Sequence, residues 1–361
     1  MGKIRPIAIY LPQFHPIPEN NAVWGDGFTE WTNVVKARPL YKHHYKPQLP
    51  ADLGFYDLRL EETRIAQAEL ARKYGIYGFA YYHYWFNGKR LLNTPLDAVL
   101  KSNIPDFPIC LFWANETWSR RWLGEEKNII IKQTYSEEDD YNHIHWLIKI
   151  FSDSRYIKVG RRPVFIIYRP THIPDIHNTI KIFRSECIKA GIENPYLIAS
   201  NSHSGSVGLN KFGFDGILNF EPQLGALPYY KNDGKSIRKF FNNLKYGIIN
   251  CKLKIYNYEF AHKKMMDIKY KYKYFPCTFV NWDNTPRRSE NGIIIQNSSP
   301  EKFRYFLEKN IEKLNSMDFG PDENFIFINA WNEWAEGNYL EPDVKNGLSY
   351  LEAVKKAITK F

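Results

Sequence analysis

A short apolar run late in the sequence reads Asn324-Phe325-Ile326-Phe327-Ile328-Asn329-Ala330 and continues into Trp331-Asn332-Glu333-Trp334-Ala335-Glu336-Gly337. Bulky apolar residues flanked by polar ones predict a buried β-strand. Two glutamates, each beside a tryptophan, follow the predicted strand at a spacing of three residues. If the chain turns helical there, residues three apart share one face, so the two carboxylates would meet. Repulsion between them costs stability, so the fold alone does not require this arrangement.

Tryptophans beside Glu333 and Glu336 predict a partly dry pocket, in which one carboxyl would keep its proton. One acid and one base are what the cleavage of a glycosidic bond requires. The structural alternative is a pair of solvated glutamates near a helix start, stabilised by the helix dipole. We interpret Glu333 and Glu336 as the candidate catalytic pair.

Seven further strand-like runs precede this one, so strands are expected at 4–11, 77–85, 107–114, 163–169, 196–201, 214–221, 275–283 and 324–331. Helical patterns are expected at 59–74, 137–151, 176–190, 300–314 and 348–358. Most of the strands are apolar on both faces, as strands covered by helices are. This alternation predicts an α/β fold, a (β/α)8 TIM-type barrel. A doubly wound sheet is the alternative, but no G-x-G-x-x-G follows a strand and no phosphate-binding loop motif occurs.

Residues 1–361 are expected to form a single catalytic barrel domain, because no repeat, linker or domain boundary interrupts the pattern. Two inserted loops are long, at about 12–58 after the first strand and about 222–274 after the sixth. Loops of this length usually carry function.

Composition excludes several classes of protein. The chain of 361 residues has 44% hydrophobic residues, and no apolar run approaches the length of a membrane span. The N-terminal residues lack a signal-peptide pattern, which predicts a cytoplasmic, at most membrane-peripheral, protein. The four cysteines are scattered, so neither a disulfide framework nor a zinc site is indicated. No metal and no cofactor is expected, since the histidine pairs at 43–44 and 143–145 lack a third ligand at metal spacing.

The formal net charge is +10, and lysines alternate with tyrosines between Lys245 and Tyr274. We call residues 245–274 the basic strip. It could contact an anionic lipid or an acidic polysaccharide. Nucleic acid is not expected, because the chain carries no signature of a nucleic-acid-binding fold. A solvated surface is the structural alternative.

The C-terminal ends of barrel strands build the active site of a barrel enzyme. Aromatic, amide and carboxylate side chains dominate these positions, and such residues bind sugars through ring faces and hydroxyl hydrogen bonds. Together with one aromatic residue of the first long loop, they predict an oligo- or polysaccharide site built from Gln13, His15, Trp31, Tyr82, His83, Tyr84, Trp85, Trp113, Asn115, Glu116, Tyr168, Arg169, Asn201, Glu221, Asp283, Trp331 and Asn332.

Five motifs carry a resemblance over nearly the whole chain: residues 10–16 (YLPQFHP), 27–33 (GFTEWTN), 75–86 (GIYGFAYYHYWF), 113–116 (WANE) and 331–337 (WNEWAEG). Together they resemble the WbsX-type, glycoside hydrolase family 99-like proteins of bacterial polysaccharide gene clusters. The resemblance implies a (β/α)8 barrel and retaining endo-α-1,2-mannosidase chemistry. It further implies that Glu333 is the base acting on the sugar 2-hydroxyl and Glu336 the acid on the leaving oxygen.

Three functions remain open. The first is a retaining glycoside hydrolase acting on α-linked, manno-configured residues of a surface polysaccharide or its precursor. The second is a glycosyltransferase of O-antigen or capsule synthesis, the role commonly given to WbsX-type proteins. The third, a non-catalytic glycan-binding module, is disfavoured because both glutamates are present.

Overall fold

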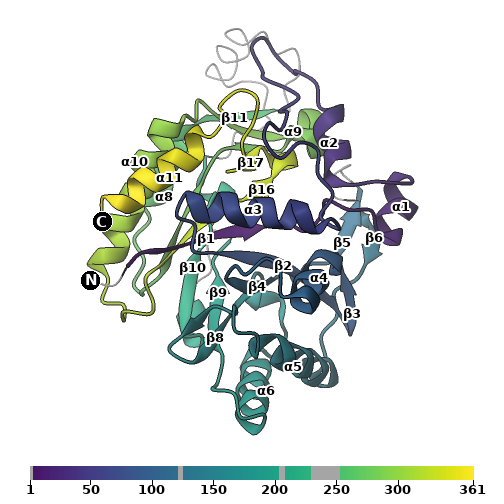
Figure 1. The fold of residues 1–361 in the computed structure, drawn as a ribbon, viewed down its shortest axis with the longest axis vertical. Helices are drawn as coiled ribbons and strands as arrows, with labels where there is room; N and C mark the ends of the chain where they lie inside the picture. Colours follow the sequence, from purple (N-terminus) through teal and green to yellow (C-terminus); the bar gives the residue numbers. More distant parts are fainter. Residues whose placement is uncertain (1–2, 121–124, 203–207, 229–252) are drawn as a thin grey trace.

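The computed structural model describes residues 3–120, 125–202, 208–228 and 253–361. Eight parallel strands close into a barrel, because β1 pairs with both β2 and β15 (Figure 1). In spatial order these strands are β1 (Arg5–Tyr10), β15 (Phe325–Asn329), β12 (Phe275–Phe279), β10 (Gly216–Asn219), β9 (Tyr196–Ser200), β8 (Arg162–Ile167), β4 (Ile109–Trp113) and β2 (Gly78–Phe86). The predicted (β/α)8 barrel is therefore confirmed, and each strand overlaps one of the eight predicted runs.

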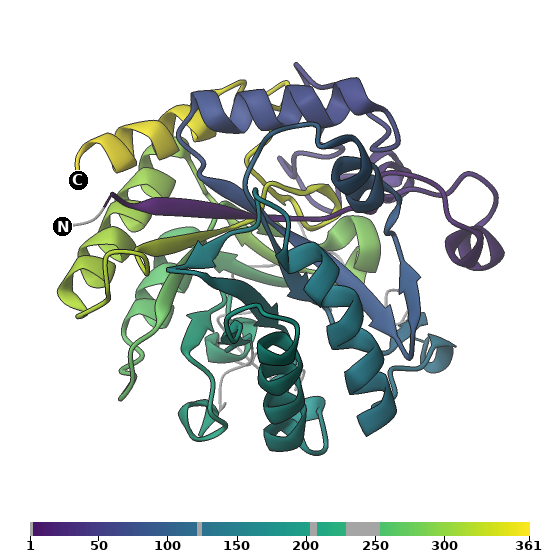
Figure 2. The same cartoon turned by 60° about the horizontal axis from the view of Figure 1, so that its bottom comes forward.

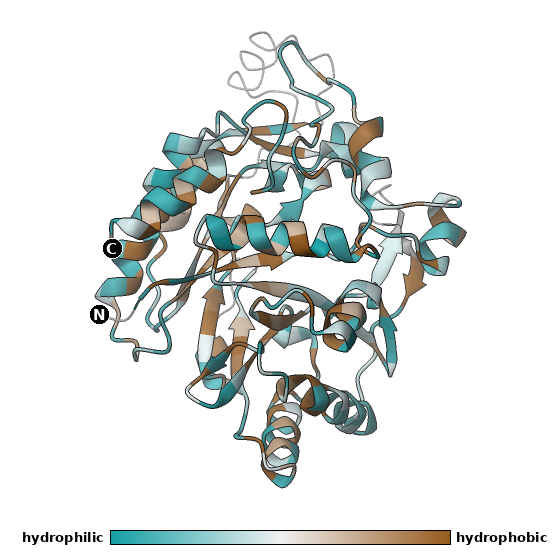
Figure 3. Ribbon diagram, viewed as in Figure 1, coloured by the Kyte–Doolittle hydropathy of each residue, from teal (hydrophilic) through white to brown (hydrophobic). Residues whose placement is uncertain are grey.

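Helices surround the barrel (Figure 2). All five predicted helices are present, as α3 (Glu61–Lys73), α5 (Glu137–Phe151), α6 (Ile176–Lys189), α10 (Pro300–Ser316) and α11 (Ser349–Thr359). Ser136 and Ser299 cap α5 and α10 through their side chains, which satisfies backbone N–H groups that the first helical turn leaves unpaired. Apolar and polar residues alternate along the helices, as the brown and teal segments of Figure 3 show, and all five helices contribute apolar residues to the core.

Several short elements were not predicted. The first long insertion carries α1 (Pro18–Trp24) and α2 (Glu30–Lys36), and α4 (Thr94–Ser102) follows β2. The second insertion carries β11 (Lys254–Asn257) and α8 (Tyr258–Met266), and α9 (Thr285–Arg288) follows β13 (Trp282–Asp283). The remaining short strands are β3 (Lys89–Leu91), β5 (Trp118–Arg120), β6 (Glu125–Ile131), β7 (Lys158–Val159), β14 (Ile293–Gln296), β16 (Asn332–Glu333) and β17 (Asn338–Tyr339). Most of them are too short for hydrophobic periodicity to mark them in the sequence, and the seven-residue β6 begins with four charged or polar residues.

Part of the basic strip packs against the barrel wall. Residues 245–252 lie outside the described residues, whereas Tyr272 and Tyr274 pack on an apolar cluster formed by Ala199, Leu209 and Ile217. The described part of the connection between β9 and β10 contains only a 3-10 turn. The two tyrosines thus cover a stretch of barrel wall that a helix would otherwise cover, while Lys269, Lys271 and Lys273 stay exposed.

A search of the described helices found none that is both long and apolar enough to cross a membrane. Within the same residues, Cys110, Cys187 and Cys277 are buried free thiols.

Candidate active site

The motif after β15 is held rigidly at the C-terminal end of the barrel. Asn332 is fully buried and links the ends of β1 and β15, since its amide oxygen accepts from Leu11 N at 2.8 Å and its Nδ2 donates to Leu11 O at 3.0 Å. The chain then forms a two-residue strand and a 3-10 turn over Trp334–Glu336 rather than an α-helix. Gly337 ends the turn with a φ of +61°, where a Cβ would lie 3.2 Å from the Cβ of Asp283. The turn therefore favours glycine for both backbone and packing reasons.

This turn brings the two predicted catalytic carboxylates onto one guanidinium. Arg287, on α9, donates from Nη2 to Glu333 at 3.0 Å and from Nη1 to Glu336 at 2.6 Å. Its Nε donates to Glu30, on α2, at 2.7 Å. Glu30 is fully buried, and the Arg287 side chain is 8% exposed. One cation thus holds three carboxylates in a largely dry site.

The pKa values of Glu333 and Glu336 are both raised in this cluster. Burial raises the pKa of Glu333, Arg287 opposes the shift, and Glu336 and Glu30 add to it. Burial also raises the pKa of Glu336, again against the opposing effect of Arg287. Since three carboxylates share one guanidinium, the cluster favours keeping a proton near neutral pH.

A pocket of about 280 Å³ opens beside the pair. Its described lining is largely aromatic and acidic and comprises Leu11, Gln13, Asn20, Trp24, Tyr82, Tyr84, Ala114, Glu116, Thr117, Trp118, Ser119, Ile130, Tyr168, Phe220, Trp282, Arg287, Glu333 and Glu336. Inside the barrel, the ring of Phe112 lies 5.3 Å from that of Tyr82 and 5.7 Å from that of Tyr168. Seven predicted site residues therefore meet here: Gln13, Tyr82, Tyr84, Glu116, Tyr168, Glu333 and Glu336.

Strand alternation separates the other aromatic candidates from the pocket. Along β2, Tyr82 and Tyr84 face the pocket, whereas His83 and Trp85 pack outward against α5. The ring of His83 contacts that of His143 at 2.9 Å between their Nε2 atoms, and burial lowers the pKa of His83 to about 3. Trp113 also packs on His143. These side chains belong to the barrel–helix interface.

Further predicted residues, most of them at strand ends and one, Trp31, on α2, do not line the pocket. His15, Trp31 and Trp331 are buried in the protein, and Trp31 donates to the carbonyl of Tyr56. Asn115 joins β4 to β8 through Arg169 N and O, and Asn201 donates to Asn219. Arg169 pairs with Glu116 at 2.6 Å, so it contacts the pocket through that carboxylate.

Glu221 lies behind the barrel wall. Its carboxylate is 3.6 Å from His262, whose ring is sandwiched between Phe279 and Phe306. Burial raises the pKa of Glu221 to about 8, with Lys313 opposing.

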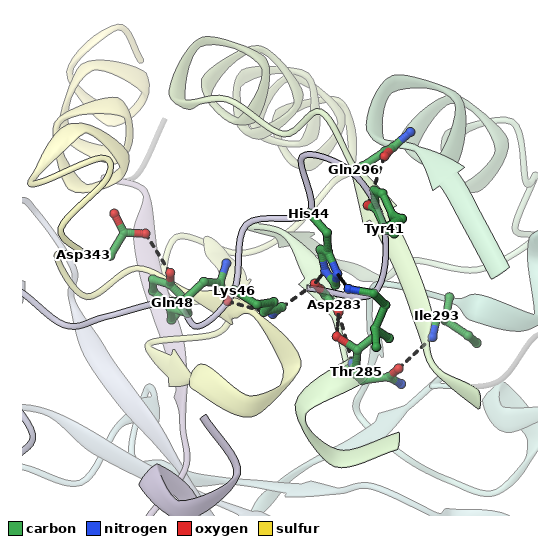
Figure 4. Close-up of polar contacts among 12 residues, drawn as sticks. Tyr41, His44, Lys46, Gln48, Asp283, Thr285, Ile293, Gln296 and Asp343 are labelled. Atoms are coloured by element: carbon green, nitrogen blue, oxygen red, sulfur yellow. Dashed lines mark hydrogen bonds and ion pairs between the residues drawn. The ribbon is translucent and has the colours of Figure 1, made fainter. Parts of the chain in front are cut away.

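Asp283 is enclosed by protein groups, as Figure 4 shows. It accepts from His44 Nε2 at 2.7 Å and from Thr285 Oγ1 at 2.6 Å, and Lys46 Nζ lies 3.0 Å away. Burial opposes ionisation, but Lys46 and His44 outweigh it, so the pKa of Asp283 is lowered. Because Thr285 starts α9, this cluster anchors the helix that carries Arg287.

Sequence reasoning missed Arg287, Glu30, Asn20, Trp24 and Trp118. The sequence does offer one signal for Arg287. Asp283 ends a strand and Pro286 lies in the first turn of α9, which places Arg287 at the strand-end face. Two buried carboxylates also require a cation, and few arginines follow strand ends.

The described residues contain no group of three or more histidine, cysteine, aspartate or glutamate side chains placed to hold a metal ion.

A closed (β/α)8 barrel with a largely aromatic and acidic pocket at the C-terminal ends of its strands places the chain in the barrel class of proteins. Residues 6–354 match the family described as "Glycosyltransferase WbsX". The chain belongs to this family, as the resemblance in its motifs implied.

Two curated relatives extend the comparison. Both are described as uncharacterized protein WxcX, from two strains of Xanthomonas campestris pv. campestris. The first is 37% identical over 355 residues and the second 36% over 356, in each case 98% of this chain and 49% of the relative. The chain thus spans about half the length of the curated relatives it matches.

Solved structures share the fold at low sequence identity. One described as a glycoside hydrolase-like protein superposes with a TM-score of 0.61 at 14% identity, covering 99% of this chain and 94% of that one. A GH99 endo-alpha-mannosidase from Bacteroides thetaiotaomicron superposes with a TM-score of 0.57 at 14% identity, covering 99% and 97%. These matches establish the barrel architecture.

Proposed function

We propose that this chain is a retaining glycosidase or transglycosidase that acts on α-linked, manno-configured residues of a bacterial surface polysaccharide or its precursor. The observation that carries the proposal is the pair Glu333 and Glu336, which one guanidinium holds together at the wall of a largely aromatic and acidic pocket. Shared burial raises both carboxyl pKa values and favours one protonated and one ionised member, as acid–base catalysis at a glycosidic bond requires.

Burial raises the pKa of Glu333 to about 8, and Glu336 makes the shorter contact with Arg287, so the proposed reaction requires the proton of the pair to move to Glu336 when the substrate binds. The ionised Glu333 then removes the proton of the sugar 2-hydroxyl. The hydroxyl oxygen attacks C1 as the C1–O bond to the leaving group breaks, and Glu336 gives its proton to the leaving oxygen. A 1,2-anhydro sugar results. Glu336 then takes a proton from water or an acceptor hydroxyl, whose oxygen opens the ring at C1 while Glu333 returns its proton to O2. Two inversions at C1 give net retention.

Electrostatics supports a neutral glycan over a nucleotide sugar as donor. In the described pocket lining the cation is Arg287, which three carboxylates already contact, and the charge of Glu116 is paired with Arg169. Such a site suits the positive charge that develops on the ring in the transition state, whereas a diphosphate would be repelled. A glycosyltransferase using an activated donor is the second candidate, favoured by the name of the matched family.

The test separates these two reactions. The protein is incubated with the polysaccharide of its own organism and, separately, with nucleotide sugars plus acceptor. New reducing ends or transfer products from polysaccharide alone support the proposal, whereas turnover only with nucleotide sugars supports the transferase. A 2-deoxy-2-fluoro substrate should be inert, because it lacks the nucleophilic hydroxyl. A glycosyl adduct trapped on Glu333 would instead establish ordinary double displacement.

Glu333→Gln and Glu336→Gln should each lower kcat by orders of magnitude while leaving the fold intact. Glu30→Gln is the matched control, because Glu30 contacts the same guanidinium but does not line the pocket. An equal loss in all three variants would show that total cluster charge, rather than proton transfer by the pair, limits the reaction.

A further inference from the structure

A second groove, of about 730 Å³, lies at the opposite end of the barrel. Its walls are the start of β1, the end of α3, the end of α11 and the loop before β15. Figure 1 shows this end of the molecule beside the N and C labels. The candidate active site is at the C-terminal ends of the strands, so the groove plays no part in it.

Positive charge dominates the described lining of this groove. It contains one acidic residue, Asp322, against five basic ones, namely Lys3, Arg5, Arg72, Lys73 and Lys355. Asp322 is itself 59% exposed and lies 3.7 Å from the Arg5 guanidinium. The Arg5 side chain is only 14% exposed, and its Nε and Nη2 atoms have no hydrogen-bond partner among the described residues. Asp322 is the anion that faces this nearly buried guanidinium, so the surplus positive charge of the lining comes from the four other basic residues.

Helix dipoles account for only part of this charge. Arg72 and Lys73 form the last turn of α3, where cations are stabilised in any protein. Arg5, however, begins β1 and Lys3 lies two residues before it, and the dipole of a strand is small. Arg5 is instead stacked on the ring of Phe325, 4.5 Å from its centroid, and paired with Asp322, so a helix dipole does not explain its position.

Apolar side chains line the groove beneath the charges. Ile4, Ile76 and Phe107 are each under 10% exposed, and the half-buried Ile358 and the exposed Pro321 border them. A site for a free inorganic ion needs only polar donors. A cationic rim above an apolar wall instead matches an amphiphile with an anionic head.

We propose that this groove binds the anionic headgroup of a membrane phospholipid and attaches the N-terminal end of the barrel to a negatively charged membrane surface. The proposal does not depend on the reaction catalysed. Attached in this way, the barrel would present the candidate active site away from the bilayer, toward glycan in the surrounding solution.

Vesicle co-sedimentation of the whole chain tests the proposal. Phosphatidylcholine vesicles containing about one third phosphatidylglycerol should bind the protein, and pure phosphatidylcholine vesicles should not. Binding should weaken steeply as salt rises. Replacing two exposed groove lysines, Lys73→Ala with Lys355→Ala, should weaken partitioning about 30-fold, at roughly 1 kcal/mol for each cation near the surface.

Two further pairs of exposed lysines carry the same charge change. Lys36→Ala with Lys42→Ala lies on α2 and the loop after it, and Lys269→Ala with Lys271→Ala lies in the basic strip. Both should bind nearly as the unaltered chain does. Equal weakening in all three pairs would show that net charge alone governs binding. If only the pair in the basic strip weakened vesicle binding, the strip rather than the groove would contact the membrane. Either result would overturn the proposal.

Glycerol phosphate and inorganic phosphate distinguish a free anion from a lipid. A thermal shift with millimolar phosphate that the groove pair abolishes, without any vesicle binding, would assign the groove to a soluble anion and reject the lipid.

Discussion

The Nη1 atom of Arg287 lies 2.6 Å from an oxygen of Glu336. The same guanidinium reaches Glu333 at 3.0 Å, so one side chain fixes how far apart the two carboxyl groups can be. A substrate hydroxyl that approaches either oxygen must share it with this guanidinium. Arg287 therefore controls both the geometry and the proton content of the candidate pair.

Replacement of Arg287 by methionine should disable the pair. Three carboxylates would lose their common cation, which costs about 3–5 kcal/mol when a buried ion pair is broken on one side, reduced by whatever protonation the carboxyls take up. We expect lower thermal stability, roughly 100-fold lower kcat from the misplaced groups, and glutamate carboxyl pKa values that move further up in a ¹³C NMR titration. Arg288→Ala removes an adjacent charge on α9 and serves as the control. If carboxyl pKa values shift equally in both variants, general charge rather than contact is responsible.

Glu333 and Glu336 should make the folded state less stable as pH rises. The folded carboxyls have raised pKa values, so above the unfolded value of about 4.5 the folded state holds protons that the unfolded chain has released. The free energy of unfolding should then decrease as pH rises toward the raised values. Two other buried carboxyls with raised pKa values add to the trend, namely Glu221 and Glu341, which accepts a hydrogen bond from Trp334 Nε1 at 2.6 Å. The measured quantity is therefore the difference in the free energy of unfolding between the unaltered chain and Glu333→Gln in urea titrations. A constant difference across pH 5–8 would contradict the raised pKa.

Neighbouring residues on β2 should respond in opposite ways. Tyr84→Phe removes a hydroxyl from the pocket lining and should lower kcat/KM up to about tenfold, the value of one hydrogen bond, with little change in Tm. His83→Phe disrupts the contact with His143 behind the barrel wall and should lower Tm with kcat/KM retained. Reversed effects would place His83, not Tyr84, in the site.

Asp283→Asn should weaken the anchor of α9. The buried Lys46 ammonium, whose side chain is 1% exposed, would lose its carboxylate partner, an effect of about 3–5 kcal/mol. Unfolding measurements give this loss directly. If a second change, Lys46→Met, restores stability, the loss comes from the broken ion pair. If it does not, the loss comes from the hydrogen bonds that Asp283 accepts from Thr285 at the start of α9.

The barrel strands were predictable because each lies in a largely apolar run, and the larger helices because hydrophobic periodicity persists over eleven or more residues in each. Glu333 and Glu336 could be found because a local motif carries both. Strand-end position also identified Tyr82, Tyr84 and Tyr168, yet it equally selected His83, Trp85 and Trp113, which face outward. Side-chain direction depends on strand register, and one residue of uncertainty reverses it.

The contact between Arg287 and Glu30 could not be inferred from the sequence around either residue. Their contact joins α9 to α2 across 257 positions of sequence, and neither helix is long enough to show periodicity. Charge balance was the available clue, because a buried carboxylate pair requires a cation from somewhere in the chain.

Pairing of β1 with β15 joins residues about 320 positions apart, as the register of Arg5 with Phe325 shows. Contacts between such distant segments form late in folding, because a long loop must first close. During synthesis one edge of β1 therefore stays unpaired until nearly the whole described chain has left the ribosome. The turn bearing Glu333 and Glu336 directly follows β15, the strand that pairs with this edge, and Asn332 then links the turn to Leu11. Barrel closure and assembly of the carboxylate pair should therefore occur in the same folding step. A chain that has not yet closed its barrel would expose an unpaired strand edge and would be inactive.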